Sequence, residues 1–150
     1  VETGLSEIPR RSRLAEAVND VLHWSSEIDD WEDAWGRVEG KYGRYHPVHT
    51  INNAALVVLG LLYGEGDFGR SICLAVMGGW DADCNGATVG SIVGAMVGAK
   101  GLPAEWTRCL NDRVETYVVG AGSPTISGLA QRTLRQSVKV LDEESAAGTR

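Results

Sequence analysis

The chain has 150 residues, a hydrophobic share of 43% and a formal net charge of -6, because 20 acidic residues outnumber 14 basic ones. This length is that of one ordinary domain, and the apolar share supports a real core, which excludes a disordered chain. The negative charge argues against nucleic acid or an anionic membrane as a partner, since both attract basic patches.

The three cysteines are Cys73, Cys84 and Cys109. Their odd number and the apolar surroundings of two of them predict free thiols, and therefore a cytoplasmic protein. The first residues, VETGLSEIPRRSR, lack the apolar segment of a signal peptide. The apolar stretch 71–102 is interrupted by acidic residues, and about 15 apolar residues follow them, whereas a membrane span needs about 20. We expect no membrane-spanning segment.

Helical periodicity runs through the first half of the chain. Apolar residues recur at intervals of three and four in Leu14–Leu22 and again in Ile28–Tyr42, which predicts two amphipathic helices. The segment Ile51–Tyr63 (INNAALVVLGLLY) is apolar on nearly all sides. We expect it to be a central, buried helix.

The second half continues this pattern. We expect a short helix over Ser71–Gly78, capped by its serine, and a further helix over Gly86–Ala99. Pro103 is typical of a helix start, and the helix after it is expected to continue through Trp106–Val119. The last helix is expected over Ile126–Leu141, with DEESAAGTR as a frayed tail.

The fold class follows from what the pattern lacks as well as from what it contains. No segment alternates with a period of two residues, and the β-rich run YVVG is too short for a sheet. No repeat or linker divides the chain. The sequence therefore predicts an all-α fold in which residues 1–150 form a single unit.

Four glycines lie on one face of the helix expected over Gly86–Ala99. They are Gly86, Gly90, Gly94 and Gly98, and they recur every four residues. Each costs the helix about 0.5–1 kcal/mol relative to alanine. We expect the stripe to allow close approach of another helix backbone, so that this helix holds the DADCN segment before it rigidly.

Two carboxylates, Asp81 and Asp83, stand one residue apart in GGWDADCNG, between two apolar segments. Buried carboxylates are costly, and two neighbours repel each other unless a positive group compensates them. A helix N-terminus, an arginine or a divalent cation can compensate. Mg²⁺ and Mn²⁺ prefer carboxylate oxygens, so Asp-x-Asp suits them. The alternative is that Asp83 only caps a helix and Asp81 is solvated.

The segment GGWDADCNGATVGSIVGAMVGAKGLPAEWTRCLND resembles the C-terminal motif of the ADP-ribosylglycohydrolase family. The family pattern is Gly-x-Asp-Thr/Ala-Asp-Thr/Cys-Asn, then a helix rich in Gly and Ala, then Gly-x-x-x-Ile/Leu-Pro-x-x-Trp. It corresponds here to Gly79–Asn85 and Gly98–Trp106, and the segments HTINNAALVVLGLLYG and ISGLAQRT also look like the family. The resemblance extends from about Gly4 to Leu141.

The resemblance implies a compact all-α helix bundle with two Mg²⁺ ions, or Mn²⁺, in a central cleft. It also implies hydrolysis that removes ADP-ribose, or a related ribosyl or glycosyl group, at the anomeric carbon. Asp81 and Asp83 would be the catalytic metal ligands, and Cys84 would take a weakened ligand position. The metals would orient the ribose hydroxyls and polarise a water molecule. The substrate itself stays open.

Two departures from the family pattern concern the metal ligands. Many members have threonine where this chain has Cys84, and a thiol suits Mg²⁺ poorly. The other ligands of the family come from an N-terminal Thr-Asp-Asp segment, which this sequence lacks. The pair Asp29-Asp30 in SSEIDDWEDAW is interpreted as the solvated face of an amphipathic helix.

The chain, which starts with valine, therefore resembles the C-terminal half of a family member. We expect its site to be completed by an N-terminal half on a cleaved or separate polypeptide. We expect this chain alone to have no glycohydrolase activity. The alternative is a catalytically inactive nucleotide-binding or scaffold protein on the same fold, which pairing of the two aspartates with arginine would favour.

A second group of candidates opens the buried helix. By the resemblance, His49, Asn52 and Asn53 line the cleft and contact the substrate. The equal alternative is that Thr50 caps the helix and the two asparagines satisfy backbone groups. Gly79 and Trp80 complete the group of substrate-binding candidates.

Gly79 and Trp80 lie directly before the acidic pair. Gly79 is expected to let the backbone turn sharply into the acidic segment. Trp80 either flanks the cleft or packs in the core. Two other chemistries use neighbouring residues. One is zinc held by His46, His49 and a cysteine. The other is a cysteine hydrolase in which Cys84 acts with His49 and Asp81 and a helix N-terminus lowers the pKa of the thiol. The family pattern explains these residues better.

Overall fold

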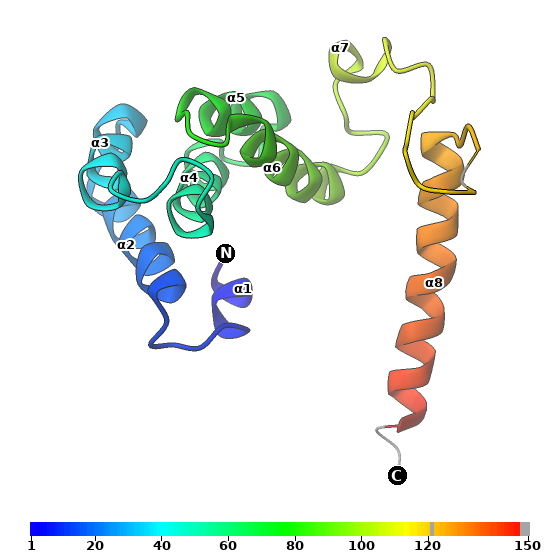
Figure 1. The fold of residues 1–150 in the computed structure, drawn as a ribbon, viewed down its shortest axis with the longest axis horizontal. Helices are drawn as coiled ribbons and strands as arrows, with labels where there is room; N and C mark the ends of the chain where they lie inside the picture. Colours follow the sequence, from blue (N-terminus) through cyan, green and yellow to red (C-terminus); the bar gives the residue numbers. More distant parts are fainter. Residues whose placement is uncertain (121, 148–150) are drawn as a thin grey trace. The chain divides into compact units, whose positions relative to one another are not determined.

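The computed structural model describes residues 1–120 and 122–147, and the chain divides into two units, Val1–Pro103 and Ala104–Arg150. Helices account for the regular structure of the described residues, which confirms the all-α class (Figure 1). Within the described ranges, no helix combines the length and the apolar character that a membrane crossing needs. The helices are α1 (Glu2–Ser6), α2 (Arg13–Glu27), α3 (Trp31–Tyr42), α4 (Thr50–Tyr63), α5 (Phe68–Met77), α6 (Ala82–Val97), α7 (Ala104–Thr107) and α8 (Ile126–Ala147).

Helix α4 forms the centre of the first unit. It packs against α2 and α3 on one side and against α5 and α6 on the other (Figure 1). Ala55, Leu56 and Leu59 are completely buried there. Burial of each leucine side chain contributes about 1.5–3 kcal/mol. The central, buried helix expected from the sequence is therefore confirmed.

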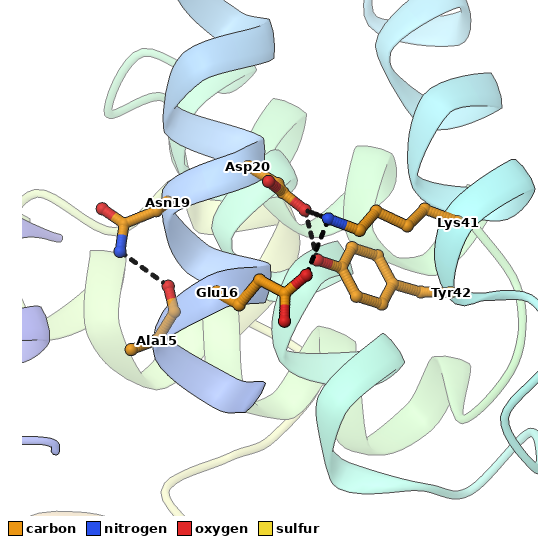
Figure 2. Close-up of polar contacts among 6 residues, drawn as sticks. All are labelled: Ala15, Glu16, Asn19, Asp20, Lys41 and Tyr42. Carbon is orange, nitrogen blue, oxygen red and sulfur yellow. Dashed lines mark hydrogen bonds and ion pairs between the residues drawn. The ribbon is translucent and has the colours of Figure 1, made fainter. Parts of the chain in front are cut away.

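Helices α2 and α3 are joined by a polar cluster in addition to their apolar contacts. The Asp20 carboxylate accepts hydrogen bonds from Lys41 Nζ and from the Tyr42 hydroxyl, and Lys41 Nζ lies 2.9 Å from Glu16 Oε1 (Figure 2). The bond to Asp20, followed by the contact with Glu16, raises the pKa of Lys41 above its ordinary value. Burial, followed by the bond to Asp20, raises the pKa of Tyr42. The chain itself thus compensates the charge of Asp20.

The Asp29-Asp30 pair does not lie on a helix, contrary to the prediction. Helix α2 ends and α3 begins on either side of it, so both residues belong to the connection. Asp30 is the N-cap of α3, and its Oδ1 accepts hydrogen bonds of 2.8 and 3.1 Å from the N–H groups of the second and third helical residues. The helix starts later than the periodicity predicted because this extended backbone lets the carboxylate satisfy those donors.

Helix α5 begins at Phe68, before the predicted cap Ser71. Asp67 caps it instead, since its Oδ1 accepts the N–H of Arg70 at 2.7 Å. Ser71 is completely buried against α4, where a Cβ at Gly64 would lie only 1.9 Å from its Oγ. Close backbone approach therefore occurs between α4 and α5, at a glycine that the sequence pattern did not single out.

Helix α6 begins four residues before the predicted Gly86, so most of DADCN is the first helical turn rather than a loop. Its glycine stripe faces α5: a Cβ at Gly86 would lie 2.8 Å from Val76 Cγ2, and one at Gly90 would lie 3.2 Å from Ile72 Cδ1. These neighbours are side chains rather than the helix backbone that we predicted. Gly98 is the C-cap of α6, with a φ of 70°. The glycines of the stripe still allow α6 to pack closely against α5.

The second unit departs most from the prediction. Helix α7 covers only four residues instead of continuing to Val119. Asn111 and Asp112 both adopt positive φ, which ends helical progression, and Arg113 forms an isolated bridge with Thr125. Propensity alone does not reveal these turns, because the segment contains neither Pro nor Gly before residue 120.

Helix α8 continues to Ala147, so residues 142–147 of the expected frayed tail are helical. Residues 148–150 of that tail lie outside the described residues. Glutamate and alanine in DEESAA are good helix formers, which explains the extension. At the start of α8, Asp112 accepts hydrogen bonds of 2.8 Å from the N–H and 2.6 Å from the Oγ of Ser127, and these bonds lower the pKa of its carboxyl group.

Candidate functional site

A sharp turn joins α5 to α6 and presents the acidic motif. Gly79 and Trp80 adopt φ of 82° and 52°, and Asp81 is the N-cap of α6. A glycine adopts the left-handed region without strain, whereas a tryptophan there is strained and needs support from its surroundings. Trp80 packs against the main core, and Trp35 Nε1 donates a 3.0 Å hydrogen bond to Gly78 O just before the turn. The turn is thus fixed from both sides.

The structure brings together the three predicted metal-binding side chains. One ligand atom each of Asp81, Asp83 and Cys84 lies within 4.8 Å of the others. Asp81 is partly buried, and the other two are exposed. In the ranges that the structure describes, no Lys, Arg or His side chain forms an ion pair with either aspartate. The arginine pairing that would have favoured a scaffold is therefore not observed among these residues.

The start of α6 tests the interpretation of Asp83 as a helix cap. Asp81, not Asp83, occupies the N-cap position, and its side chain makes no capping hydrogen bond. Asp83 lies in the first turn, so the interpretation of Asp83 as the N-cap is wrong. Free N–H groups and the helix dipole at this end favour negative charge, by about 0.3–1 kcal/mol at an exposed position.

The Cys84 thiol does not have the properties of an activated nucleophile. Its hydrogen bond to Asp81, and then the negative charge of Asp81, raise its pKa above the ordinary value. The cysteine hydrolase alternative required the helix N-terminus to lower this pKa, and the carboxylates outweigh that effect. The zinc alternative finds no support either, because the metal-ligand cluster found among the described residues contains no histidine.

His49 and the two asparagines lie at the start of α4. His49, rather than Thr50, is the N-cap, and its Nδ1 accepts the N–H of Ile51 at 3.2 Å. Asn52 is completely buried, and its Nδ2 donates to His46 O at 3.3 Å.

Asn53 connects this region with the acidic turn. Its Nδ2 donates to Pro47 O at 2.6 Å and to His49 O at 2.8 Å. Its Oδ1 accepts the N–H of Asp81 at 3.1 Å and Nδ2 of Asn85 at 2.8 Å. Asn85 was part of the quoted motif, but we assigned it no role. Its fixed position in the motif, two residues after Asp83, was the only sequence feature that pointed to a role for Asn85.

A groove of about 460 Å³ lies beside the acidic turn within the first unit. Its walls are mainly apolar and come from α1, α2, α4 and α6. Asn53, Asp81, Cys84 and Asn85 line one part of it. Thr88, which sequence reasoning did not single out, joins the wall from the next turn of α6. Of the other substrate-binding candidates, none of His49, Asn52, Gly79 and Trp80 belongs to its described lining.

The fold and the site together define an all-α protein whose candidate site is an acidic first helical turn beside an apolar groove. Comparison with known families gives the particular assignment: the model of the ADP-ribosylglycohydrolase family matches residues 1–142. The chain therefore belongs to this family, and membership indicates a glycohydrolase-like activity. Searches of curated proteins and of solved structures found no significant match.

Proposed function

We propose that this chain supplies part of the active site of a divalent-metal-dependent glycohydrolase. The reaction is hydrolysis of an ADP-ribosyl, or related ribosyl or glycosyl, bond at its anomeric carbon. The observation that carries the proposal is the pair Asp81 and Asp83, which lie close together at the start of α6 and form no ion pair with a cationic side chain of the described residues.

The donor atoms fit a hard cation. Two carboxylates on a short turn are suitable ligands for Mg²⁺ or Mn²⁺, which keep several water molecules. Cys84 fits less well because sulfur is a soft ligand and suits these hard ions poorly, so it contributes little to binding. Asp81 and Asp83 would hold one or two ions, and the metal, when bound, supplies a polarised water molecule and orients the sugar hydroxyls.

The chain's own residues prepare this site before metal binds. The positive φ of Gly79 and Trp80 turns the backbone so that Asp81 starts α6. The N-terminus of the helix faces the same region and favours the negative charge that both carboxylates carry. The packing of α6 on α5 holds the turn in place.

The partner in this proposal is a polypeptide segment carrying Thr-Asp-Asp-type acidic ligands. Two carboxylates leave most positions of a two-metal centre unfilled, and the described residues offer no second cluster of ligands. The apolar groove runs up to Asp81 and Cys84, so a segment that buries an apolar face there would bring its acidic residues to the same ions. On this basis the isolated chain has no activity.

The second candidate function is an inactive nucleotide-binding or scaffold protein. Two observations favour it: Cys84 stands where many family members have a threonine hydroxyl, and the sequence has no Thr-Asp-Asp segment. The bare acidic pair argues against it, since a scaffold gains nothing from uncompensated repulsion.

Mn²⁺ titration followed by electron paramagnetic resonance tests the metal site in the chain itself. We expect saturable binding that Mg²⁺ displaces and that Asp83→Asn weakens. Asp33→Asn is the matched control, because Asp33 also occupies the first turn of its helix. Equal binding by wild type and Asp83→Asn would overturn the proposal.

Mass spectrometry of the purified protein, denatured and native, tests the partner. A second polypeptide with a Thr-Asp-Asp-type segment should co-migrate with this chain in the native spectrum. The complex should then release ADP-ribose from an ADP-ribosylated substrate in the presence of Mg²⁺. Turnover by the isolated chain would contradict the claim that its site is incomplete.

A further inference from the structure

The side chain of Asn53 is a junction between three segments of the first unit. It lies on α4, and it bonds to the loop before that helix and to the start of α6. It is 8% exposed, although it lines the groove beside the acidic turn. A buried asparagine in such a position is expected to have all its polar groups paired.

All the hydrogen-bonding capacity of this amide is used inside the chain. An asparagine side chain has two N–H donors and an oxygen that accepts two bonds. Both donors of Asn53 are used by the carbonyls of Pro47 and His49, at 2.6 and 2.8 Å. Both acceptor positions are used by Asp81 N–H and Asn85 Nδ2, at 3.1 and 2.8 Å. A rotated amide would face carbonyls with its oxygen, so the network fixes its orientation.

We infer that Asn53 is a positioning residue that holds the Asp81–Asp83 turn in the geometry needed for metal binding, rather than a residue that contacts the substrate. The bond from Asp81 N–H fixes the N-cap whose own side chain makes no capping bond. The bond from Asn85 fixes the first turn of α6 one residue beyond Cys84. This inference rests on the proposed function, because it assigns the support of that same site.

Asn52 provides a matched control for Asn53. It is the adjacent residue on α4, it is completely buried, and its Nδ2 also bonds to the preceding loop, at His46 O. Its hydrogen bond stays within this region and does not reach α6. Alanine at either position therefore removes a buried amide from the same helix, but only Asn53→Ala releases the acidic turn.

The first measurement is Mn²⁺ affinity of the 150-residue chain. Partners that orient metal ligands typically change metal affinity by about 10- to 100-fold when they are removed. We expect a loss of this size for Asn53→Ala, measured under conditions where both variants are folded. Asn52→Ala should bind Mn²⁺ like the wild type. Equal affinities of the two variants would overturn the inference.

The second measurement does not depend on metal. Amide hydrogen exchange, followed by NMR without metal, should show the Asp81 N–H exchanging about fivefold faster or more in Asn53→Ala than in wild type. Asn52→Ala should leave that exchange rate unchanged after correction for global stability. Unchanged exchange in Asn53→Ala would overturn the inference. Absence of Mn²⁺ binding by the wild type would instead overturn the proposed function.

A milder variant keeps the test decisive if Asn53→Ala does not fold. Asn85→Ala removes one of the two bonds that Oδ1 of Asn53 accepts and leaves the one from Asp81 N–H. We expect it to weaken Mn²⁺ binding less than the 10- to 100-fold range, by roughly threefold to tenfold, and more than Asn52→Ala does. An Asn85→Ala affinity equal to that of Asn52→Ala would contradict the inference.

Discussion

Two acidic clusters of the first unit differ in how their charge is compensated. Asp20 lies on α2, and its carboxylate accepts hydrogen bonds from Lys41 and Tyr42 of α3 (Figure 2). Asp81 and Asp83 lie at the start of α6, and neither forms an ion pair with a Lys, Arg or His side chain of the described residues. Both clusters are acidic, but only the second retains free capacity for a cation.

The comparison shows that a structural carboxylate is distinguished from a binding one by the groups that contact it, because both clusters contain acidic residues. A paired carboxylate joins two helices and leaves little room for a ligand. An unpaired pair of carboxylates keeps its mutual repulsion until a cation binds. The Asp20 cluster therefore predicts effects on stability, and the Asp81–Asp83 cluster predicts effects on binding.

The largest expected effect comes from the double variant Asp81→Asn/Asp83→Asn. We expect it to lower the affinity for Mn²⁺ by about 100-fold or more, because it removes both charged ligands. Its melting temperature without metal should change little, because the repulsion between the carboxylates and their attraction to the helix N-terminus oppose each other. Calorimetry with and without Mg²⁺ measures both, because metal should stabilise only the wild type. A large loss of stability in the absence of metal would show that these aspartates have structural partners.

Asp20→Ala should have the opposite profile. It leaves the buried Tyr42 hydroxyl without its acceptor, so we expect the free energy of unfolding to fall by about 1–3 kcal/mol. Mn²⁺ affinity should not change. Urea denaturation measures the loss, and Asp33→Ala serves as the control for removing an acidic side chain. A variant as stable as the control would mean that the Asp20 cluster contributes nothing measurable.

The packing of α6 on α5, which holds the acidic turn in place, can be tested by substituting glycines of the stripe. A Cβ at Gly94 would make an ordinary contact, 3.5 Å from Phe68 Cε2, so Gly94→Ala should raise stability by about 0.5–1 kcal/mol. A Cβ at Gly86 would lie 2.8 Å from Val76 Cγ2, so Gly86→Ala should gain less or lose stability. Thermal unfolding of both variants gives the comparison. A larger gain at Gly86 would argue that α6 is loosely seated on α5.

The smallest expected effect is a pH dependence of the Asp20 cluster. The folded pKa values of Lys41 and Tyr42 are raised, so their contribution to stability is complete below their unfolded values, near pH 10. It is lost as the pH rises further, through the folded values. Lys41 is partly exposed, so solvent screens its share. Urea denaturation above about pH 9 should show a shallower decline in Asp20→Asn than in wild type.

The site and the fold were predictable from the sequence to different degrees. The spacing of apolar residues predicted α2 to α6 but not α1, and the family motif singled out Asp81, Asp83 and Cys84, which the structure places close together. Helix starts were less predictable: Asp30, Asp67 and Asp81 occupy N-cap positions that periodicity alone did not assign. A cap depends on the backbone angle of one residue, and a pattern that spans several turns does not specify it.

Periodicity and the order of motif residues were enough to predict the all-α class, the buried central helix and the family. Only the tertiary structure decided how Asn53 is used. Its partners, Asp81 and Asn85, lie 28 and 32 residues away in the chain. The pairing of a buried amide depends on which helix ends meet in space, and helical periodicity carries no information about such contacts. For the same reason, the sequence did not show that Asp20 is bonded by Lys41 and Tyr42 of another helix, whereas Asp81 forms no ion pair among the described residues.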